Sequence, residues 1–211
     1  MGNQTLIKAT FDELRIDPDL WICTLRPAIT NTLLAGGLAV LPTETSYMLG
    51  GDATNVQTME RLRQLKNRSM NHDISVMVAD IETARRWTVW SPAAMQIGTT
   101  ALPGPLTLVL PLRSDALQFA SRSPYLGIRI PGMPYLLDLL RSLPFPVSAT
   151  SANPSGSPEP YDVSRCVSPV DLVWDAGRLT CNTPSTVMRV DDESVTVLRQ
   201  GAFRLPDEWI I

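Results

Sequence analysis

Histidine and cysteine are scarce in this chain, and their scarcity excludes several kinds of chemistry. The 211 residues contain one histidine, His72, so a histidine-rich metal site is excluded and a Ser-His-Asp triad would have to use that residue. The three cysteines, Cys23, Cys166 and Cys181, are odd in number and far apart in the sequence. This spacing argues against both a disulfide framework and a zinc site.

Long apolar runs, a leader segment and an excess of positive charge are also missing. No stretch approaches the roughly 20 apolar residues of a membrane-spanning helix, and residues 1–14 lack the apolar core of a signal peptide. We therefore expect a cytoplasmic protein with no membrane partner. The formal charge of −3 offers no overall attraction to nucleic acid, so RNA would have to bind a local basic patch.

Helix-like and strand-like segments alternate along the chain. Helical periodicity covers residues 25–36, 55–68, 80–88, 91–100 and 134–143. Strand-like runs cover residues 38–42, 74–79, 103–112, 125–131, 145–153, 171–177, 185–190 and 194–201. Prolines cluster at the boundaries of these segments, and we find no linker, internal repeat or low-complexity tract. The alternation predicts one α/β domain over residues 1–211, with a mixed sheet.

Polar side chains gather where the predicted strands and helices end. The run "LPTETSYMLGGDA" (residues 41–53) follows a buried strand, and the end of a strand is where open α/β sheets bind ligands. Serine and threonine are also ordinary turn residues. Lys66 and Arg68 end a helix, where basic residues complement the helix dipole even without a ligand. For each cluster alone, both interpretations stay open.

Two arginines interrupt strands that are otherwise apolar, Arg129 in "LGIRIP" and Arg199 in "VTVLRQG". An unpaired charge is costly in such a place, so we expect an anionic partner. Together with Lys66 and Arg68 these arginines suit a multiply charged, oxygen-rich ligand, because guanidinium groups match phosphate and carboxylate. Neither a Walker nor a dinucleotide-binding fingerprint accompanies them.

Seven motifs, in order, resemble those of the YrdC/YciO family. They are "LPTETSYMLGGDA", "LRQLKNR", "PGPLTLVL", "LGIRIPGMP", "SATSANPSG", "PSTVMRV" and "VLRQGA", and the match covers roughly residues 27–202. The best-known members of this family are threonylcarbamoyl-AMP synthases. The resemblance implies a twisted, open, mixed α/β sheet with flanking helices and a large concave pocket.

The resemblance further implies an enzyme, a nucleotidyltransferase. Synthase members use ATP, bicarbonate and L-threonine to make threonylcarbamoyl-adenylate and pyrophosphate. A separate transferase complex then uses the adenylate to modify adenosine beside the tRNA anticodon. Mg²⁺ on the triphosphate is the implied cofactor, with no metal ligand from protein side chains. No nucleophilic residue is needed, because such a transfer asks mainly for positioning and charge neutralisation.

Roles for ten residues follow from the same motifs. The resemblance implies that Lys66, Arg68, His72, Ser151, Asn153 and Arg199 bind ATP, and that Thr43, Thr45, Arg129 and Ser185 bind L-threonine. It also implies that Tyr47 and Thr107 form walls of the pocket.

Four positions depart from the synthase pattern. Ser69 and Asp73 stand where synthases carry prolines, and His72 stands where they carry a basic or amide residue. Met48 replaces a glycine and is expected to narrow the pocket beside Tyr47. The run "HDISVM" is closer to the YciO branch, so a paralogue that uses another acceptor is one alternative function. Because the chain stops at Ile211, the resemblance is to the short form, without an additional C-terminal domain.

A non-catalytic RNA-binding protein is the other alternative. Its basic patch would consist of Arg61, Arg63, Lys66 and Arg68. The first two of these arginines are better explained as the solvated face of a helix. No aromatic-rich stacking platform accompanies the patch.

Overall fold

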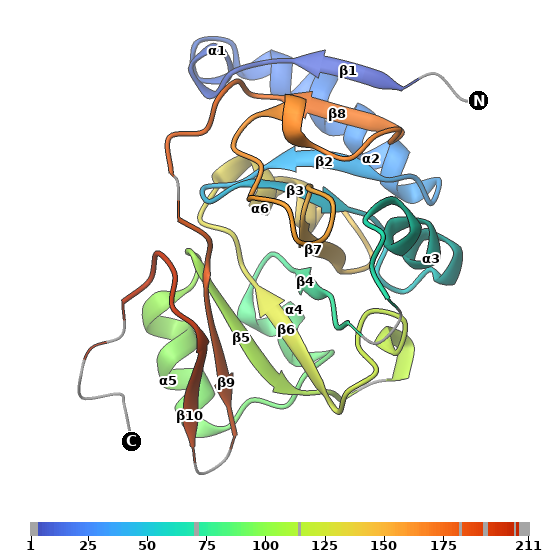
Figure 1. The fold of residues 1–211 in the computed structure, drawn as a ribbon. Coiled ribbons are helices and arrows are strands. Elements are labelled where there is room, and N and C mark those ends of the chain that lie inside the picture. The colour runs from blue at the N-terminus through green and yellow to red at the C-terminus, as the bar shows by residue number, and fades with distance from the viewer. Residues whose placement is uncertain are drawn as a thin grey trace.

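One mixed sheet runs through the whole molecule (Figure 1). The structure, a computed structural model, describes residues 4–69, 72–113, 115–181, 183–191, 194–204 and 206. The ten strands lie in the order β1-β8-β2-β3-β7-β4-β6-β5-β9-β10. Their bounds are β1 Thr5–Lys8, β2 Ala39–Pro42, β3 Tyr47–Gly50, β4 Ser75–Met77, β5 Leu106–Pro111, β6 Tyr125–Arg129, β7 Val147–Ser151, β8 Leu172–Asp175, β9 Thr186–Val190 and β10 Val195–Arg199.

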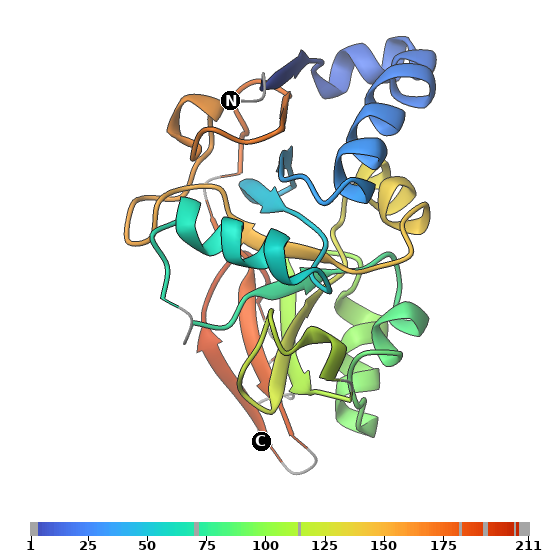
Figure 2. The ribbon, with the colours of Figure 1, turned by 90° about the vertical axis from the view of Figure 1, so that its right-hand side faces the viewer.

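Helices cover both faces of this sheet, as Figures 1 and 2 show. They are α1 Phe11–Ile16, α2 Arg26–Leu34, α3 Val56–Leu65, α4 Ile81–Arg85, α5 Pro92–Ala101 and α6 Pro134–Arg141. A π-helical segment, η1 (Leu20–Leu25), leads directly into α2, and the short 3₁₀ segments η2 (Asp115–Leu117) and η3 (Val163–Arg165) lie in loops. Across the described ranges, none of the helices combines the length and the apolar character that spanning a bilayer requires.

Parallel and antiparallel pairs both occur in the sheet. β1 and β2 pair with β8 in parallel, as do β4 with β6 and β5 with β9. The pairs β2–β3, β3–β7, β4–β7, β5–β6 and β9–β10 are antiparallel. The predicted mixed α/β sheet is therefore confirmed.

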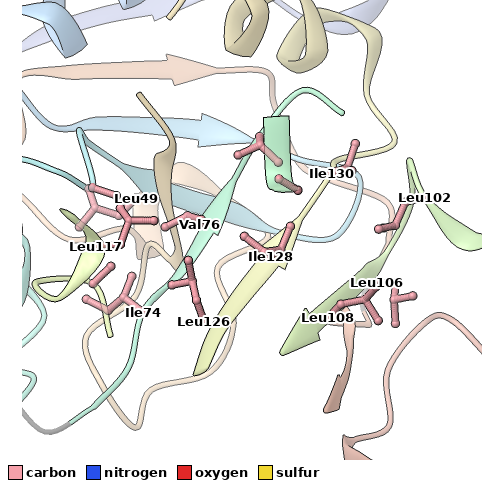
Figure 3. Close-up of a cluster of buried hydrophobic side chains, with 14 of the residues drawn as sticks. Leu49, Ile74, Val76, Leu102, Leu106, Leu108, Leu117, Leu126, Ile128 and Ile130 are labelled. Carbon is pink, nitrogen blue, oxygen red and sulfur yellow. The ribbon is translucent and has the colours of Figure 1, made fainter. Parts of the chain in front are cut away.

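The core consists of two apolar clusters, one on each face of the sheet. Because successive strand residues point to opposite faces, Val40 and Val76 join one cluster while Leu41 and Met77 join the other. Helices α3 and α5 pack on the first cluster, and α2 and α6 pack on the second. Figure 3 shows part of the first, including Val76 and Ile128 from neighbouring strands.

Helix α3 has clear start and stop signals in the sequence. The Asn55 side chain caps its first turn by accepting a hydrogen bond from the Thr58 N–H, at 3.1 Å. Met59 and Leu62 are buried on one side of the helix. The helix ends just before Asn67, whose φ of 49° is a left-handed conformation that asparagine tolerates. Helix α3 therefore ends at Leu65, with Lys66 and Arg68 directly after it.

All predicted helices and strands are present, with shorter bounds in most cases. The predicted helix 25–36 is preceded by the π-helical η1, which the periodicity did not indicate. Strand β1, helix α1 and strand β3 were not predicted. β3 lies inside the polar run at residues 41–53 and pairs with both β2 and β7, so this run forms a hairpin with a buried second strand.

Leu62→Ala is expected to destabilise the fold by about 2–5 kcal/mol, because it leaves a cavity under α3 where the leucine is fully buried. Urea denaturation would measure the change in the free energy of unfolding. The exposed Glu60 on the same helix provides the control, since Glu60→Ala should change stability by less than about 0.5 kcal/mol. Equal losses from the two substitutions would contradict the packing of α3 on the sheet.

Candidate ligand-binding site

A row of side chains crosses one face of four neighbouring strands. Met77 of β4 pairs with Arg129 of β6, Arg129 pairs with Thr107 of β5, and Thr107 pairs with Val187 of β9. Directly paired residues present their side chains on the same face of a sheet. The register therefore places an arginine and a threonine side by side on this face.

A cavity of about 170 Å³, which we call the strand cavity, opens over this row. It is lined by Thr45, Ser46, Met48, Arg68, Asp73, Ser75, Thr107, Arg129, Ala149, Thr150, Ser151, Glu159, Pro184, Ser185, Val187 and Arg199. Three of these residues are arginines, two are acidic, and seven carry hydroxyl groups. Met48, Ala149, Pro184 and Val187 supply an apolar part of the wall.

The guanidinium of Arg129 is buried at the bottom of the strand cavity, with 3% of the residue exposed. Its Nη2 donates hydrogen bonds to Glu44 Oε1 at 2.9 Å and to Thr45 Oγ1 at 2.6 Å. Thr43 Oγ1 lies 3.4 Å from the same nitrogen and 3.0 Å from Thr45 Oγ1. Among the described residues, Arg129 Nε and Glu44 Oε2 are buried without a hydrogen-bond partner.

Ser185 connects the opposite wall to the last strand. Its Oγ lies 3.1 Å from Thr107 Oγ1 and accepts a hydrogen bond from Arg199 Nη2 at 3.2 Å. Arg199 also donates to the Ser185 carbonyl at 2.8 Å. Gly201 allows this approach, because a Cβ there would lie 2.3 Å from the Pro184 carbonyl oxygen. The backbone at residue 201 thus holds Arg199 against Ser185.

A second cavity, the loop cavity, adjoins the first and encloses about 340 Å³. It is lined by Lys66, Asn67, Arg68, Ser69, His72, Ser151, Asn153, Ser155, Gly156, Ser157 and Glu159. Arg68, Ser151 and Glu159 line both cavities. The two cavities are therefore the halves of one continuous site with a shared boundary.

Lys66 joins the end of α3 to the end of β7. Its ammonium donates to the carbonyl oxygens of Ser151 and Asn153, the latter at 2.6 Å, and 2% of the residue is exposed. Burial, assisted by the positive charge of Arg68, lowers the pKa of Lys66 to about 8. The lysine thus fixes the backbone of the loop that follows β7.

The other polar side chains of the loop cavity are held in the same way. Arg68 donates to Thr150 Oγ1 at 3.0 Å and to the Asp73 carbonyl at 3.1 Å. His72 Nδ1 lies 3.1 Å from Ser69 Oγ. Asn153 donates to the Ser157 carbonyl at 2.5 Å, while its buried Oδ1 has no partner among the described residues. These contacts fix the side chains before any ligand binds.

The ten residues predicted as a site come together here. Thr45, Arg129, Ser185 and Arg199 line the strand cavity, Lys66, His72 and Asn153 line the loop cavity, and Arg68 and Ser151 line both. Thr43 lies beneath the strand cavity, where it contacts Thr45 and Arg129. Their assignment to ATP or L-threonine stays a prediction.

The structure confirms the expected anionic partner for Arg129 and corrects the expectation for Arg199. Arg129 has its anionic partner within the chain, Glu44, so its burial does not require a ligand. Arg199 is not in an apolar strand interior: β10 is the edge strand of the sheet, and Arg199 is exposed. Sequence reasoning missed Glu44, although its place between Thr43 and Thr45 was a usable signal, because a carboxylate in a buried turn needs a cationic partner.

The proposed basic patch and the proposed tyrosine wall are also corrected. Arg63 is not on a solvated helix face: it is 3% exposed and donates to the carbonyls of residues 69, 72, 119 and 120. Arg61 forms an ion pair with Asp171 at 2.6 Å. Tyr47 lines neither cavity, because its hydroxyl donates to the Gly177 carbonyl at 2.6 Å. Met48, the next residue along β3, does line the strand cavity.

Comparison with known proteins finds relatives along most of this chain. The model of the Sua5/YciO/YrdC family, described as telomere recombination, matches residues 31–201. A Methanocaldococcus jannaschii protein provisionally named as a threonylcarbamoyl-AMP synthase is 29% identical, over 83% of this chain and 84% of its own length. The threonylcarbamoyl-AMP synthase of Bacillus subtilis is 32% identical over 79% of this chain. The uncharacterized protein YciO of Escherichia coli is 26% identical, over 79% of this chain and 84% of its own length.

Solved structures show the same fold. A doubly substituted Sua5 of P. abyssi has a TM-score of 0.85 at 25% identity and covers 98% of this chain. Sua5 of P. abyssi in complex with L-threonine has a TM-score of 0.77 at 25% identity and covers 94% of this chain. This chain spans 62% and 57% of those two chains, and 50% of the B. subtilis relative.

The buried Lys66 generates a prediction about pH. Its pKa falls from 10.5 in the unfolded chain to about 8 in the folded one, so between these values the unfolded state holds more protons and stability rises with pH. Relative to Lys66→Met, the wild type should gain on the order of 3 kcal/mol of unfolding free energy from pH 7 to pH 11. Urea denaturation of both proteins across this range measures the difference, and parallel pH profiles would contradict it.

Proposed function

The chain belongs to the Sua5/YciO/YrdC family, and from this premise we propose that it is a transferase that makes threonylcarbamoyl-adenylate. Its substrates would be ATP, bicarbonate and L-threonine, and pyrophosphate would be the second product. The observation that carries the proposal is the pair of adjoining cavities with different linings. One has room for a small amino acid beside a buried arginine, and the other is bordered by basic and amide groups that suit a nucleotide.

The strand cavity would bind L-threonine. Guanidinium groups match carboxylates, and Arg129 lies at the bottom of this cavity with Thr45 beside it. The hydroxyl groups of Thr45 and Ser185 are fixed by their neighbours and would orient the substrate's polar groups. The likeness to P. abyssi Sua5 with L-threonine supports this assignment.

The loop cavity would bind ATP. Arg68 and His72 border it, and Asn153 offers a buried oxygen without a partner among the described residues. Lys66 adds a positive charge, although its ammonium is committed to two backbone carbonyls. Arg199, on the far side of the strand cavity, donates to neutral Ser185 and so keeps a charge for phosphate.

The reaction would need positioning more than acid–base chemistry. The threonine amine adds to the carbon of bicarbonate with loss of water, which gives a carbamate. A carbamate oxygen then attacks the α-phosphate of ATP in line, and pyrophosphate leaves. Side chains held by the contacts described above would place the carbamate and the α-phosphate together and neutralise the negative charge between them.

Mg²⁺ would accompany the nucleotide and supply further charge neutralisation on the triphosphate. The strand cavity is lined by two acidic residues, Asp73 and Glu159, and the described residues contain no group of three or more His, Cys, Asp or Glu side chains that could hold a metal ion. The Asp73 carboxylate already accepts a hydrogen bond from the Arg122 N–H at 3.0 Å. Because the protein offers few carboxylate oxygens here, the Mg²⁺ ion would be held mainly by the phosphate oxygens of the nucleotide. The adenylate would pass to a separate transferase complex for threonylcarbamoyladenosine modification of tRNA.

A second candidate is a YciO-type enzyme that uses another acceptor. Met48 supports it, because a methionine occupies the wall of the strand cavity next to Arg129, with its sulfur 4.0 Å from Nη1. The E. coli YciO relative also matches over most of its own length. An RNA-binding function through Arg61, Arg63, Lys66 and Arg68 is not favoured, because this set is largely buried or paired.

The proposal predicts pyrophosphate release from ATP and Mg²⁺ that requires both bicarbonate and L-threonine. Arg68→Ala and Asn153→Ala should each lower kcat/KM at least tenfold, because each removes a polar contact at the nucleotide. Arg178 is exposed and lines neither cavity, so Arg178→Ala serves as the control and should keep wild-type activity. A coupled phosphate assay would measure the rates.

Two outcomes of this assay would redirect the assignment. Release that is independent of threonine would overturn the synthase and favour the YciO-type enzyme. No release from protein whose circular dichroism shows the native fold would overturn the synthase. Full activity in Arg68→Ala and Asn153→Ala would instead contradict the loop cavity as the nucleotide site.

The division into two cavities predicts a separation of kinetic effects. Arg129→Lys removes the planar fork while keeping the charge, and it should raise the KM for L-threonine about tenfold or more with little change in the KM for ATP. Asn153→Ala should raise the KM for ATP with little change in the KM for L-threonine. Steady-state kinetics with each substrate varied would measure both constants. Parallel changes in the two constants for both variants would show that the cavities do not bind the substrates separately.

A further inference from the structure

A third cavity lies outside the site described above, between the end of α6 and helix α4. We call it the α4–α6 cavity; it encloses about 240 Å³ and is larger than the strand cavity. It is lined by Met77, Val78, Ala79, Asp80, Thr83, Arg86, Trp87, Leu140, Arg141, Leu143, Pro144 and Phe145. Figure 2 shows α6 (yellow) above the green helices, which include α4.

The inner part of the α4–α6 cavity is apolar. Met77 and Leu140 are buried there, and the aromatic rings of Trp87 and Phe145 are half-buried. The indole Nε1 of Trp87 is buried and has no hydrogen-bond partner among the described residues. Because this N–H is inaccessible, Trp87 contributes to the lining through other atoms of its ring.

Two arginines border the cavity from opposite elements, Arg86 at the end of α4 and Arg141 at the end of α6. Both are exposed, and within the part of the chain that the structure describes neither forms a side-chain hydrogen bond or an ion pair. The neighbouring carboxylate, Asp80, also lines the cavity and caps α4 by accepting from the Thr83 N–H at 2.7 Å. This hydrogen bond lowers the pKa of Asp80, and the positive charges of Arg141 and Arg86 lower it further without direct pairing. The guanidinium groups of Arg86 and Arg141 are therefore both available to bind an anionic ligand at the opening of the α4–α6 cavity.

We propose that the α4–α6 cavity binds a small phosphate monoester that carries a planar ring. The ring would lie on the apolar floor between Trp87 and Phe145, and the phosphate would lie between Arg86 and Arg141. Phosphate fits the opening of this cavity better than carboxylate does, because its three terminal oxygens can accept hydrogen bonds from two guanidinium groups that approach from different sides. An apolar pocket with a few convergent polar groups is the usual form of a small-molecule site.

This site is separate from the proposed substrate site. The α4–α6 cavity and the strand cavity share no lining residue. They are neighbours, however, because Met77 lines the first and pairs in the sheet with Arg129, which lines the second. The inference does not depend on the proposed reaction and can be tested without ATP or L-threonine.

Phenyl phosphate is the probe, and the test follows the indole N–H signals of the five tryptophans in a ¹H–¹⁵N spectrum. Trp87→Phe identifies the Trp87 signal. Titration should shift this signal saturably and leave the other indole signals nearly unchanged. Arg86→Ala and Arg141→Ala should each weaken binding about tenfold or more, because each removes a charge-assisted hydrogen bond.

Arg85→Ala is the matched control, since Arg85 is a neighbouring exposed arginine on α4 that does not line the cavity. It should leave the affinity unchanged. Loss of binding in Arg68→Ala, with binding kept in Arg86→Ala and Arg141→Ala, would assign the probe to the strand and loop cavities and overturn the proposal. Equal affinity for benzoate would overturn the phosphate assignment, and equal affinity for inorganic phosphate would overturn the role of the apolar floor.

Discussion

The burial of a guanidinium on the face of the sheet is the constraint on which the site depends. Arg129 lies on β6, an inner strand of the ten-stranded sheet, and is almost fully inaccessible. A buried charge is tolerated only when it is paired and hydrogen-bonded. The turn between β2 and β3 meets this need with Glu44 and two threonine hydroxyls. The density of polar residues after a buried strand is therefore a consequence of the arginine beneath them.

Two other cations are buried around the same site, and backbone carbonyls hold both. Arg63 donates to the loop after α3 and to the loop before β6, while Lys66 donates to the end of β7. Each arrangement costs desolvation free energy that the hydrogen bonds must offset. Loops held in this way lose little further entropy when a ligand binds. Buried cations thus make the site rigid before binding, and the more exposed Arg68 and Arg199 remain for the ligand.

Local signals made much of the fold predictable, and long-range contacts explain what was missed. Helix α3 has its cap, its apolar stripe and its stop within fourteen residues, so its place followed from the sequence. Arg63 looked solvated because it lies on the polar side of that pattern, and its partners at residues 119 and 120 lie more than fifty positions away. Tyr47 likewise bonds to Gly177, far along the chain. The motifs located the site's residues, whereas their partners depend on tertiary packing.

Because the strand cavity is small, the two proposed substrates would meet at the boundary that it shares with the loop cavity. At about 170 Å³ it is smaller than the roughly 300–1,000 Å³ typical of small-molecule sites, so in the proposed function the nucleotide would lie mainly in the loop cavity. In the proposed reaction the α-phosphate must contact both the amino-acid carbamate and the nucleotide, so it would lie where the cavities meet. Arg68 lines both cavities and, among the described residues, donates only to neutral oxygens. Its charge is therefore not cancelled by direct pairing with a carboxylate, which makes it the cation best placed to stabilise the developing charge on the transferred phosphate.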